Sequence, residues 1–293
     1  MHLRSAEIVV ISDVHLGTYG CHAKELLLYL RSIKTETLII NGDFIDAWQF
    51  KKKYFPKEHL EVISEIIRMS VEGTKVYYIT GNHDDVLRKF SDVSAGSIHL
   101  RDKLILMLGG KKHWFFHGDI FDASVLVMPF IAKLGGKGYD WLIRINRLVN
   151  NMRSKMGMSK YSFAGKIKSG VKRAVKFIQD FENKAIEVAA EKDYDVVICG
   201  HIHQPQNRHI ILENKSVHYL NSGDWVENLT SLEYKFGKWS IYKFDEIEFS
   251  YVNSKLTIEE EKEKNNIDQH KTTREVIYEK IVPFSERESK VLH

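Results

Sequence analysis

The 293-residue sequence predicts an α/β fold. Five short apolar runs that are rich in β-branched and aromatic residues are typical of buried strands; they lie at 8–11, 38–40, 76–79, 114–116 and 196–199. Helical patterns at 23–33 and 60–71 separate the first three runs, as in βαβ units. We therefore expect a mixed or parallel sheet that is covered on both sides.

The later part of the chain departs from this rhythm. Residues 121–192 show helical spacing, and we expect a helical insertion that acts as a lid over the site. Strands are predicted at 217–220, 232–236 and 239–244, with a hairpin turn at Gly237-Lys238. Residues 1–256 would then form the main domain, and 257–293 a charged, flexible tail.

Composition and charge restrict the class of protein. With 43% hydrophobic and 28% charged residues, the chain has the composition of a globular protein. Its longest membrane candidate, 125–132, is far shorter than the roughly 20 residues of a membrane helix, and no apolar signal segment opens the sequence, so we expect a cytoplasmic protein. We expect Cys21 and Cys199 to be free thiols.

Residues 133–176 contain twelve basic residues and one acidic residue, Asp140. This excess predicts an anionic partner. Nucleic acid, anionic lipid head groups and a phosphorylated substrate all fit the charge alone.

A polar cluster begins where each of the first five apolar runs ends. These clusters lie at 12–15, 41–43, 81–84, 117–119 and 200–203. Because ligands of open α/β sheets bind beyond the carboxyl ends of the strands, the clusters are expected to converge on one site.

The side chains in these clusters suit divalent cations, because Mn²⁺, Fe²⁺ and Zn²⁺ accept carboxylate oxygen and imidazole nitrogen. Seven residues are candidate ligands: Asp13, His15, Asp43, Asn82, His117, His201 and His203. Asp43 follows a glycine that allows a tight turn, and is placed to bridge two ions. Neutral His and Asn ligands would leave the site positive enough to attract a phosphate, so the pattern predicts a two-metal phosphoesterase.

Five motifs together resemble the signature of calcineurin-like metallophosphoesterases, over about residues 6–245: Asp13-x-His15, Gly42-Asp43-x-x-Asp46, Gly81-Asn82-His83-Asp84, His117-Gly118-Asp119 and Gly200-His201-x-His203. The resemblance implies a four-layer β-sandwich flanked by helices. It also implies one metal ion on Asp13, His15, Asp43 and His203, and a second on Asp43, Asn82, His117 and His201. We expect Mn²⁺, while Fe²⁺ and Zn²⁺ suit the same ligands.

The same resemblance implies that His83 is the general acid for the leaving oxygen, while water activated by the two cations attacks phosphorus. Asp84 or Asp46 would orient His83. A purely structural His83 is the alternative.

A narrower resemblance, to the UDP-2,3-diacylglucosamine pyrophosphohydrolases of lipid A synthesis, rests on Gly138-Tyr139-Asp140, Arg144-x-Asn146-Arg147, residues 171–175 and residues 221–227. It implies a nucleotide-sugar lipid substrate, with UMP and a diacylglucosamine 1-phosphate as products. Trp141, Arg144, Arg147 and Lys172 are the candidate substrate-binding residues. The best-studied branch of that group has Arg where this sequence has His83.

The insertion can be interpreted in two ways. In the first, its apolar residues line an acyl-chain groove, while its basic residues contact phosphates or the anionic inner membrane surface. In the second, the apolar residues only pack helices together. Two other functions remain open: the same enzyme chemistry on another nucleotide, phosphodiester or phosphoprotein, and a non-catalytic scaffold that binds a partner. We do not expect nucleic acid as a partner, although Tyr161 and Phe163 in the basic stretch leave it open.

Overall fold

The structure is a computed structural model that describes residues 4–47, 54–124, 163–213 and 215–246, with the backbone alone at 122–124 and 163–173. The chain divides into two compact units, Met1–Phe244 and Asp245–His293. The predicted tail, 257–293, lies outside the described residues.

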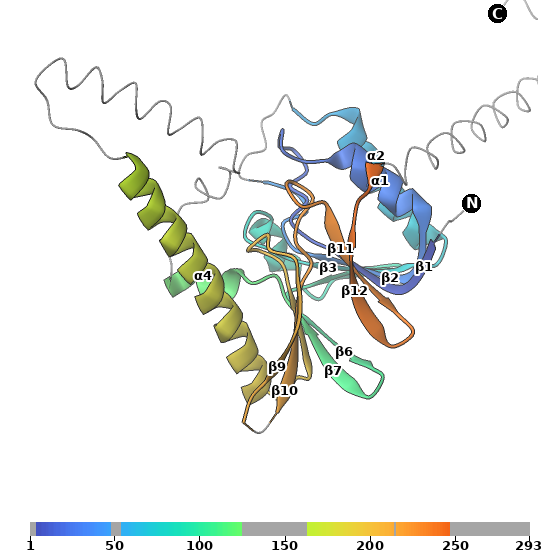
Figure 1. The fold of residues 1–293 in the computed structure, drawn as a ribbon. Helices are drawn as coiled ribbons and strands as arrows, with labels where there is room; N and C mark the ends of the chain where they lie inside the picture. The colour runs from blue at the N-terminus through green and yellow to red at the C-terminus, as the bar shows by residue number, and fades with distance from the viewer. Residues whose placement is uncertain (1–3, 48–53, 125–162, 214, 247–293) are drawn as a thin grey trace, which may run out of the picture. The chain divides into compact units, whose positions relative to one another are not determined.

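Two sheets form this unit (Figure 1). The seven-stranded sheet has the order β12-β11-β1-β2-β3-β5-β4, and the five-stranded sheet has the order β6-β7-β8-β10-β9. The strands of the first are β1 (Arg4–Ile11), β2 (Ile33–Asn41), β3 (Lys75–Ile79), β4 (Ser94–Ala95), β5 (Ile98–Arg101), β11 (Thr230–Lys235) and β12 (Lys238–Lys243). Those of the second are β6 (Leu104–Leu108), β7 (Lys111–Phe115), β8 (Val196–Cys199), β9 (Gln206–Ile211) and β10 (Ser216–Asn221).

Most inner strands of both sheets are parallel, which brings their carboxyl ends to a common edge, whereas β11 is antiparallel to both β1 and β12. β1 pairs in parallel with β2, β2 with β3, and β3 with β5. In the second sheet β8 lies parallel to both β7 and β10, while β6 and β9 add antiparallel edges.

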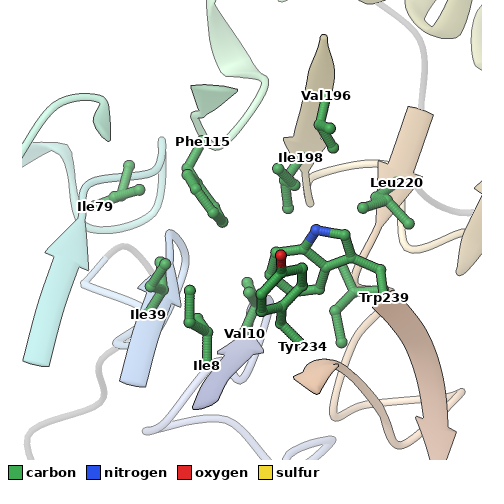
Figure 2. Close-up of a cluster of buried hydrophobic side chains, with 11 residues drawn as sticks. Ile8, Val10, Ile39, Ile79, Phe115, Val196, Ile198, Leu220, Tyr234 and Trp239 are labelled. Atoms are coloured by element: carbon green, nitrogen blue, oxygen red, sulfur yellow. The ribbon is translucent and has the colours of Figure 1, made fainter. Parts of the chain in front are cut away.

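The hydrophobic core lies between the two sheets (Figure 2). Ile8 and Val10 of β1 meet Phe115, Ile198 and Leu220 from the second sheet. Since side chains alternate along a strand, the residues between them point to the opposite face, and β1 is therefore buried on both sides. This is the apolar run expected of a strand in a covered sheet.

Helices cover the outer faces. α1 (Ala23–Ser32) and α2 (Lys57–Val71) pack together beside β2 and β3. On the second sheet, α4 (Phe163–Glu191) buries Phe181, Ala185 and Ala189 against a cluster that includes Trp114 and Val197; Figure 1 shows this helix along β9 and β10. The short 3-10 helices η1 (Asp85–Phe90) and η2 (Asp119–Ser124) follow β3 and β7. The predicted helix-flanked sandwich of four layers is confirmed.

Outside the insertion, every strand and helix predicted above is present, but the division into two sheets comes from long-range pairing that apolar runs do not reveal. β4, β5, β6 and β9 were not predicted, because β4 has only two residues, β5 and β9 carry many polar residues, and β6 follows β5 closely. The β11–β12 turn is Phe236-Gly237, one residue before the predicted position. Both residues have positive φ, 51° and 74°, as a type I′ turn requires.

Part of the predicted insertion is visible. α4 occupies Phe163–Glu191, while residues 125–162 lie outside the described part of the chain, so the lid stays a prediction. Cys21 and Cys199 are free, as expected, and Cys199 is buried. Among the described residues, no helix is long and apolar enough to cross a membrane.

Two isoleucines on strands test the core. Ile198 is fully buried between the sheets, whereas Ile211 on β9 is 87% exposed. We expect Ile198→Ala to lower the free energy of unfolding by about 2–5 kcal/mol, because it leaves a cavity in a packed core. Ile211→Ala is the matched control and should change it by less than about 0.5 kcal/mol. Denaturant titration of both variants measures the difference, and equal losses would contradict this assignment of the core.

Candidate metal centre

The seven predicted ligands follow the carboxyl ends of five strands from both sheets. Asp13 and His15 follow β1, Asp43 follows β2, and Asn82 follows β3; His117 follows β7, and His201 and His203 follow β8. Backbone hydrogen bonds join neighbouring loops, since Asp13 N–H donates to Gly42 O (3.1 Å) and Gly200 N–H to His117 O (3.0 Å). The Asp13 carboxylate accepts the His201 N–H at 3.1 Å, which ties the two sheets together.

Five of these residues have left-handed backbone conformations, which non-glycine residues rarely adopt. They are Asp13 (φ 52°), His15 (53°), Asp43 (52°), His201 (66°) and His203 (53°). Such a conformation costs of order 1–3 kcal/mol per residue and persists where the surroundings enforce it, as at functional sites. The strand ends are thus bent to turn these side chains toward one place.

The side chains form three groups whose potential ligand atoms lie within 4.8 Å of one another. These groups are Asp13, His15 and His203; His15, Asp43 and His83; and Asp43, His117 and His201. Asp43 belongs to two of them, and its Oδ2 lies 3.9 Å from His15 Nε2 and 3.3 Å from His117 Nε2. A carboxylate between two groups of imidazoles is suited to bridge a pair of cations.

A buried atom supports a metal at this site. Asn82 Oδ1 has no hydrogen-bond partner among the described residues. His117 Nδ1 lies 2.9 Å from the carbonyl oxygen of Asn41, which can only accept a hydrogen bond, so Nε2, 3.3 Å from Asp43 Oδ2, is the nitrogen that would bind a cation in place of its proton. A buried polar atom without a partner is costly, and coordination of a cation would remove that cost.

Glycines make the close approach of the loops possible. A Cβ at Gly81 would lie 2.2 Å from Asp43 Oδ1, and one at Gly200 would lie 2.5 Å from Asp13 Oδ2. Any side chain at either position would displace a candidate ligand. Steric exclusion therefore explains why a glycine precedes Asn82 and another precedes His201.

In the metal-free chain, both aspartates are held in their charged form. Burial alone would raise the pKa of Asp13, but the adjacent His203 outweighs it and the pKa is lowered. The pKa of Asp43 is also lowered, because His117 and His15 outweigh the effect of burial. Burial alone would lower the pKa of His203, but the charge of Asp13 and a hydrogen bond to it outweigh this effect and raise the pKa to about 9. Two ionised carboxylates in a buried site attract cations.

His83 is positioned by Asp46. His83 Nδ1 lies 3.0 Å from Asp46 Oδ2, and the same oxygen lies 3.4 Å from His15 Nδ1. Burial would lower the pKa of His83, but the hydrogen bond to Asp46 and the charge of Asp43 raise it overall. His83 is therefore held beside Asp46 and Asp43, whose charges favour its protonated form.

Asp84, the other predicted partner of His83, has different contacts. Its carboxylate accepts hydrogen bonds from Gly81 N–H (2.6 Å), Phe44 N–H (2.9 Å) and the Tyr78 hydroxyl (2.6 Å). These contacts brace the loops after β2 and β3. Asp84 thus supports the turns that carry Asp43 and Asn82.

The segment Asn221 to Asn228 also supports the site, a role that the sequence did not reveal. Asn221 Nδ2 donates to Gly200 O (2.8 Å), and Trp225 N–H donates to Asp13 O (3.1 Å). The fully buried Asp224 accepts backbone N–H groups from Val226 and Asn228 and lies 4.0 Å from His203 Nδ1. A polar Asn-Ser-Gly-Asp run directly after a predicted strand was the available signal.

The predicted substrate-binding residues are not placed by the structure. Trp141, Arg144 and Arg147 lie outside the described residues. Lys172 lies in α4, at a position where only the backbone is described.

Several known proteins with similar sequences are named UDP-2,3-diacylglucosamine hydrolase. The UDP-2,3-diacylglucosamine hydrolase of Aliivibrio fischeri (strain MJ11) is 27% identical over 80% of this chain and 98% of its own length. The enzyme of the same name from Wigglesworthia glossinidia brevipalpis is 26% identical over 84% of this chain and 97% of its own. Among solved structures, a dimetal phosphatase from Danio rerio aligns with a TM-score of 0.38 and 11% identity, covering 80% of this chain and 95% of that one.

Residues 6–205 match the family model described as calcineurin-like phosphoesterase. This match covers more than half of the chain and includes all seven residues that the strand ends bring together. The chain is a metal-dependent phosphoester hydrolase and belongs to the calcineurin-like phosphoesterase family.

Proposed function

We propose that this protein hydrolyses the pyrophosphate bond of UDP-2,3-diacylglucosamine or a close analogue, releasing UMP and a diacylglucosamine 1-phosphate. The observation that carries the proposal is the arrangement of ligands around Asp43, in a chain that is similar to enzymes of that specificity over almost their whole length. Such a substrate would require work at a membrane surface, and the basic stretch 133–176 gives a reason for contact with anionic lipid.

The donor set supports two metal ions. Asp13, His15, Asp43 and His203 would hold one, and Asp43, Asn82, His117 and His201 the other. The oxygen and imidazole ligands suit Mn²⁺, Fe²⁺ or Zn²⁺, and we propose Mn²⁺. When bound, such ions lower the pKa of water and neutralise charge on phosphoryl oxygens.

The chain itself supplies the proton and its orientation. His83 would donate the proton, since it follows the ligand Asn82 and its Nδ1 lies 3.0 Å from Asp46 Oδ2, which leaves Nε2 for the leaving oxygen. The backbone N–H of His83 donates to Asp43 Oδ1 at 2.8 Å, so the general acid and the bridging carboxylate are held in register. A proton from His83 would neutralise negative charge that develops on the oxygen of the leaving phosphate.

Removal of the shared ligand should abolish metal binding. Asp43→Ala should lose both ions, whereas His203→Ala should lose one, because the proposal puts Asp43 in both sites and His203 in a single site. Metal analysis after dialysis gives the number of ions per chain. Asp193→Ala, which changes an exposed aspartate that pairs with Lys112 and Lys215, is the control and should keep both ions. Two ions retained by Asp43→Ala would rule out the bridging role.

Substrate identity is tested by UMP release. With Mn²⁺, the protein should release UMP from UDP-2,3-diacylglucosamine but not from UDP-glucose, because acyl chains contribute binding, and Asp43→Ala should be inactive. Bis-p-nitrophenyl phosphate reports on the metal centre alone. Cleavage of only this diester would reject the lipid substrate and favour another phosphodiester, while inactivity toward every substrate would favour the scaffold function.

The role of His83 is tested by comparing substrates with different leaving groups. His83→Ala should lower kcat on a phosphodiester with an alkyl leaving group, whose alkoxide needs a proton to depart, by about 10²–10⁴-fold, the usual contribution of a general acid. The loss should be much smaller for bis-p-nitrophenyl phosphate, since nitrophenolate leaves without a proton. Asp46→Asn should act in the same direction, because Asp46 orients His83. Equal losses on both substrates, at unchanged metal content, would indicate a structural His83.

A further inference from the structure

An exposed tyrosine, Tyr19, lies on the loop that follows β1 and packs against Tyr54, which precedes α2. Tyr19 is 76% exposed, although large apolar rings are usually covered. Its ring lies 3.8 Å from that of the half-buried Tyr54, centroid to centroid, with 35° between the ring planes. The proposed chemistry uses neither residue.

The pair is held in place by one buried histidine. Gly17 N–H donates to His59 Nδ1 at 2.9 Å, and the rings of Tyr54 and Phe55 pack edge-on against the same imidazole, at 6.1 Å and 5.3 Å. His59 therefore fixes both the loop that carries Tyr19 and the residues that precede α2. The aromatic surface is preorganised in the free protein, which lowers the entropic cost of binding a ligand.

The loop also lies at the rim of the metal centre. It begins at His15, whose carbonyl oxygen accepts hydrogen bonds from the Thr18 N–H (3.2 Å) and hydroxyl (2.9 Å). It ends at His22, whose N–H donates to Trp225 O (3.0 Å) in the segment that braces Asp13. Tyr19 is four residues from His15, a separation of at most about 14 Å between their Cα atoms.

We propose that Tyr19, supported by Tyr54, is a stacking platform for the nucleobase of the substrate, so that the nucleotide half extends from the metal centre over the loop after β1. This inference rests on the proposed nucleotide substrate. An acyl chain would need an enclosed apolar groove, whereas Tyr19 is open to water and polar at its hydroxyl. A base offers a flat face to a tyrosine ring and keeps its edge in water.

The test compares two ligands that differ in the base. UMP and ribose 5-phosphate carry the same phosphorylated sugar, and each is titrated into the Mn²⁺-loaded full-length protein by calorimetry. UMP should bind on the order of tenfold more tightly, since stacking of one base contributes about 1–3 kcal/mol. Tyr19→Ala should remove this advantage and leave the affinity for ribose 5-phosphate unchanged. Tyr19→Phe should retain it, and Tyr54→Ala should weaken it.

Phe236→Ala is the matched control, because Phe236 is 83% exposed on the β11–β12 turn and should not affect either ligand. The platform is rejected if the wild-type protein binds UMP no better than ribose 5-phosphate, or if Tyr19→Ala weakens both ligands equally. Base-dependent binding that requires Tyr19, in a protein that cleaves the simple diester but not UDP-2,3-diacylglucosamine, would retain the platform and reject only the lipid substrate. Cleavage of the lipid substrate, with no effect of Tyr19→Ala on base-dependent binding, would retain the lipid substrate and reject the platform.

Discussion

The carboxylate of Asp43, buried between the imidazoles of His15 and His117, is the interaction on which the rest of the site depends. A buried charge is tolerated only when it is paired. Without a cation the pairing comes from His117, and a divalent cation would replace the proton on its Nε2. The loops around Asp43 each accommodate this carboxylate in a different way. They supply an imidazole, a backbone N–H from His83, or the space left by the missing side chain of Gly81.

The backbone conformations that bring the candidate ligands to Asp43 are energetically unfavourable. Five candidate ligands occupy left-handed conformations, each with a cost of order 1–3 kcal/mol. Two packed sheets provide what opposes this strain, because the core side chains Val10, Ile39 and Ile198 lie in the strands that lead directly into these turns. The strands cannot relax at their ends without disturbing the core between the sheets. The packing between the two sheets therefore maintains the strained backbone conformations of the candidate ligands.

The ligands were predictable from sequence because each follows an apolar run directly, so that the strand pattern and the chemistry mark the same positions. Asp46 and Asp84 show the limit of that approach. Both are buried aspartates near His83 in sequence or space, yet only the fold decides that Asp46 reaches its imidazole while Asp84 reaches three donors in the turns. The two-sheet division was equally hidden, since β8 joins β7 across the long segment that contains α4, and no local pattern encodes that pairing.

Substrate choice must come from outside the ligand set, because a pair of cations in this setting acts on any phosphate ester that reaches it. The rim of the site is built from the loop after β1 and the segment from Asn221 to Asn228, which touch through His22 and Trp225. Both also hold ligands, His15 in one case and His203 through Asn228 in the other. A substrate group bound at this rim would press on the same backbone that orients the ligands. If a nucleotide stacks on Tyr19 as proposed, its recognition would be coupled to the alignment of the metal ligands by direct hydrogen bonds, which would give the chain a physical means to favour substrates that fill the rim over those that reach only the metals.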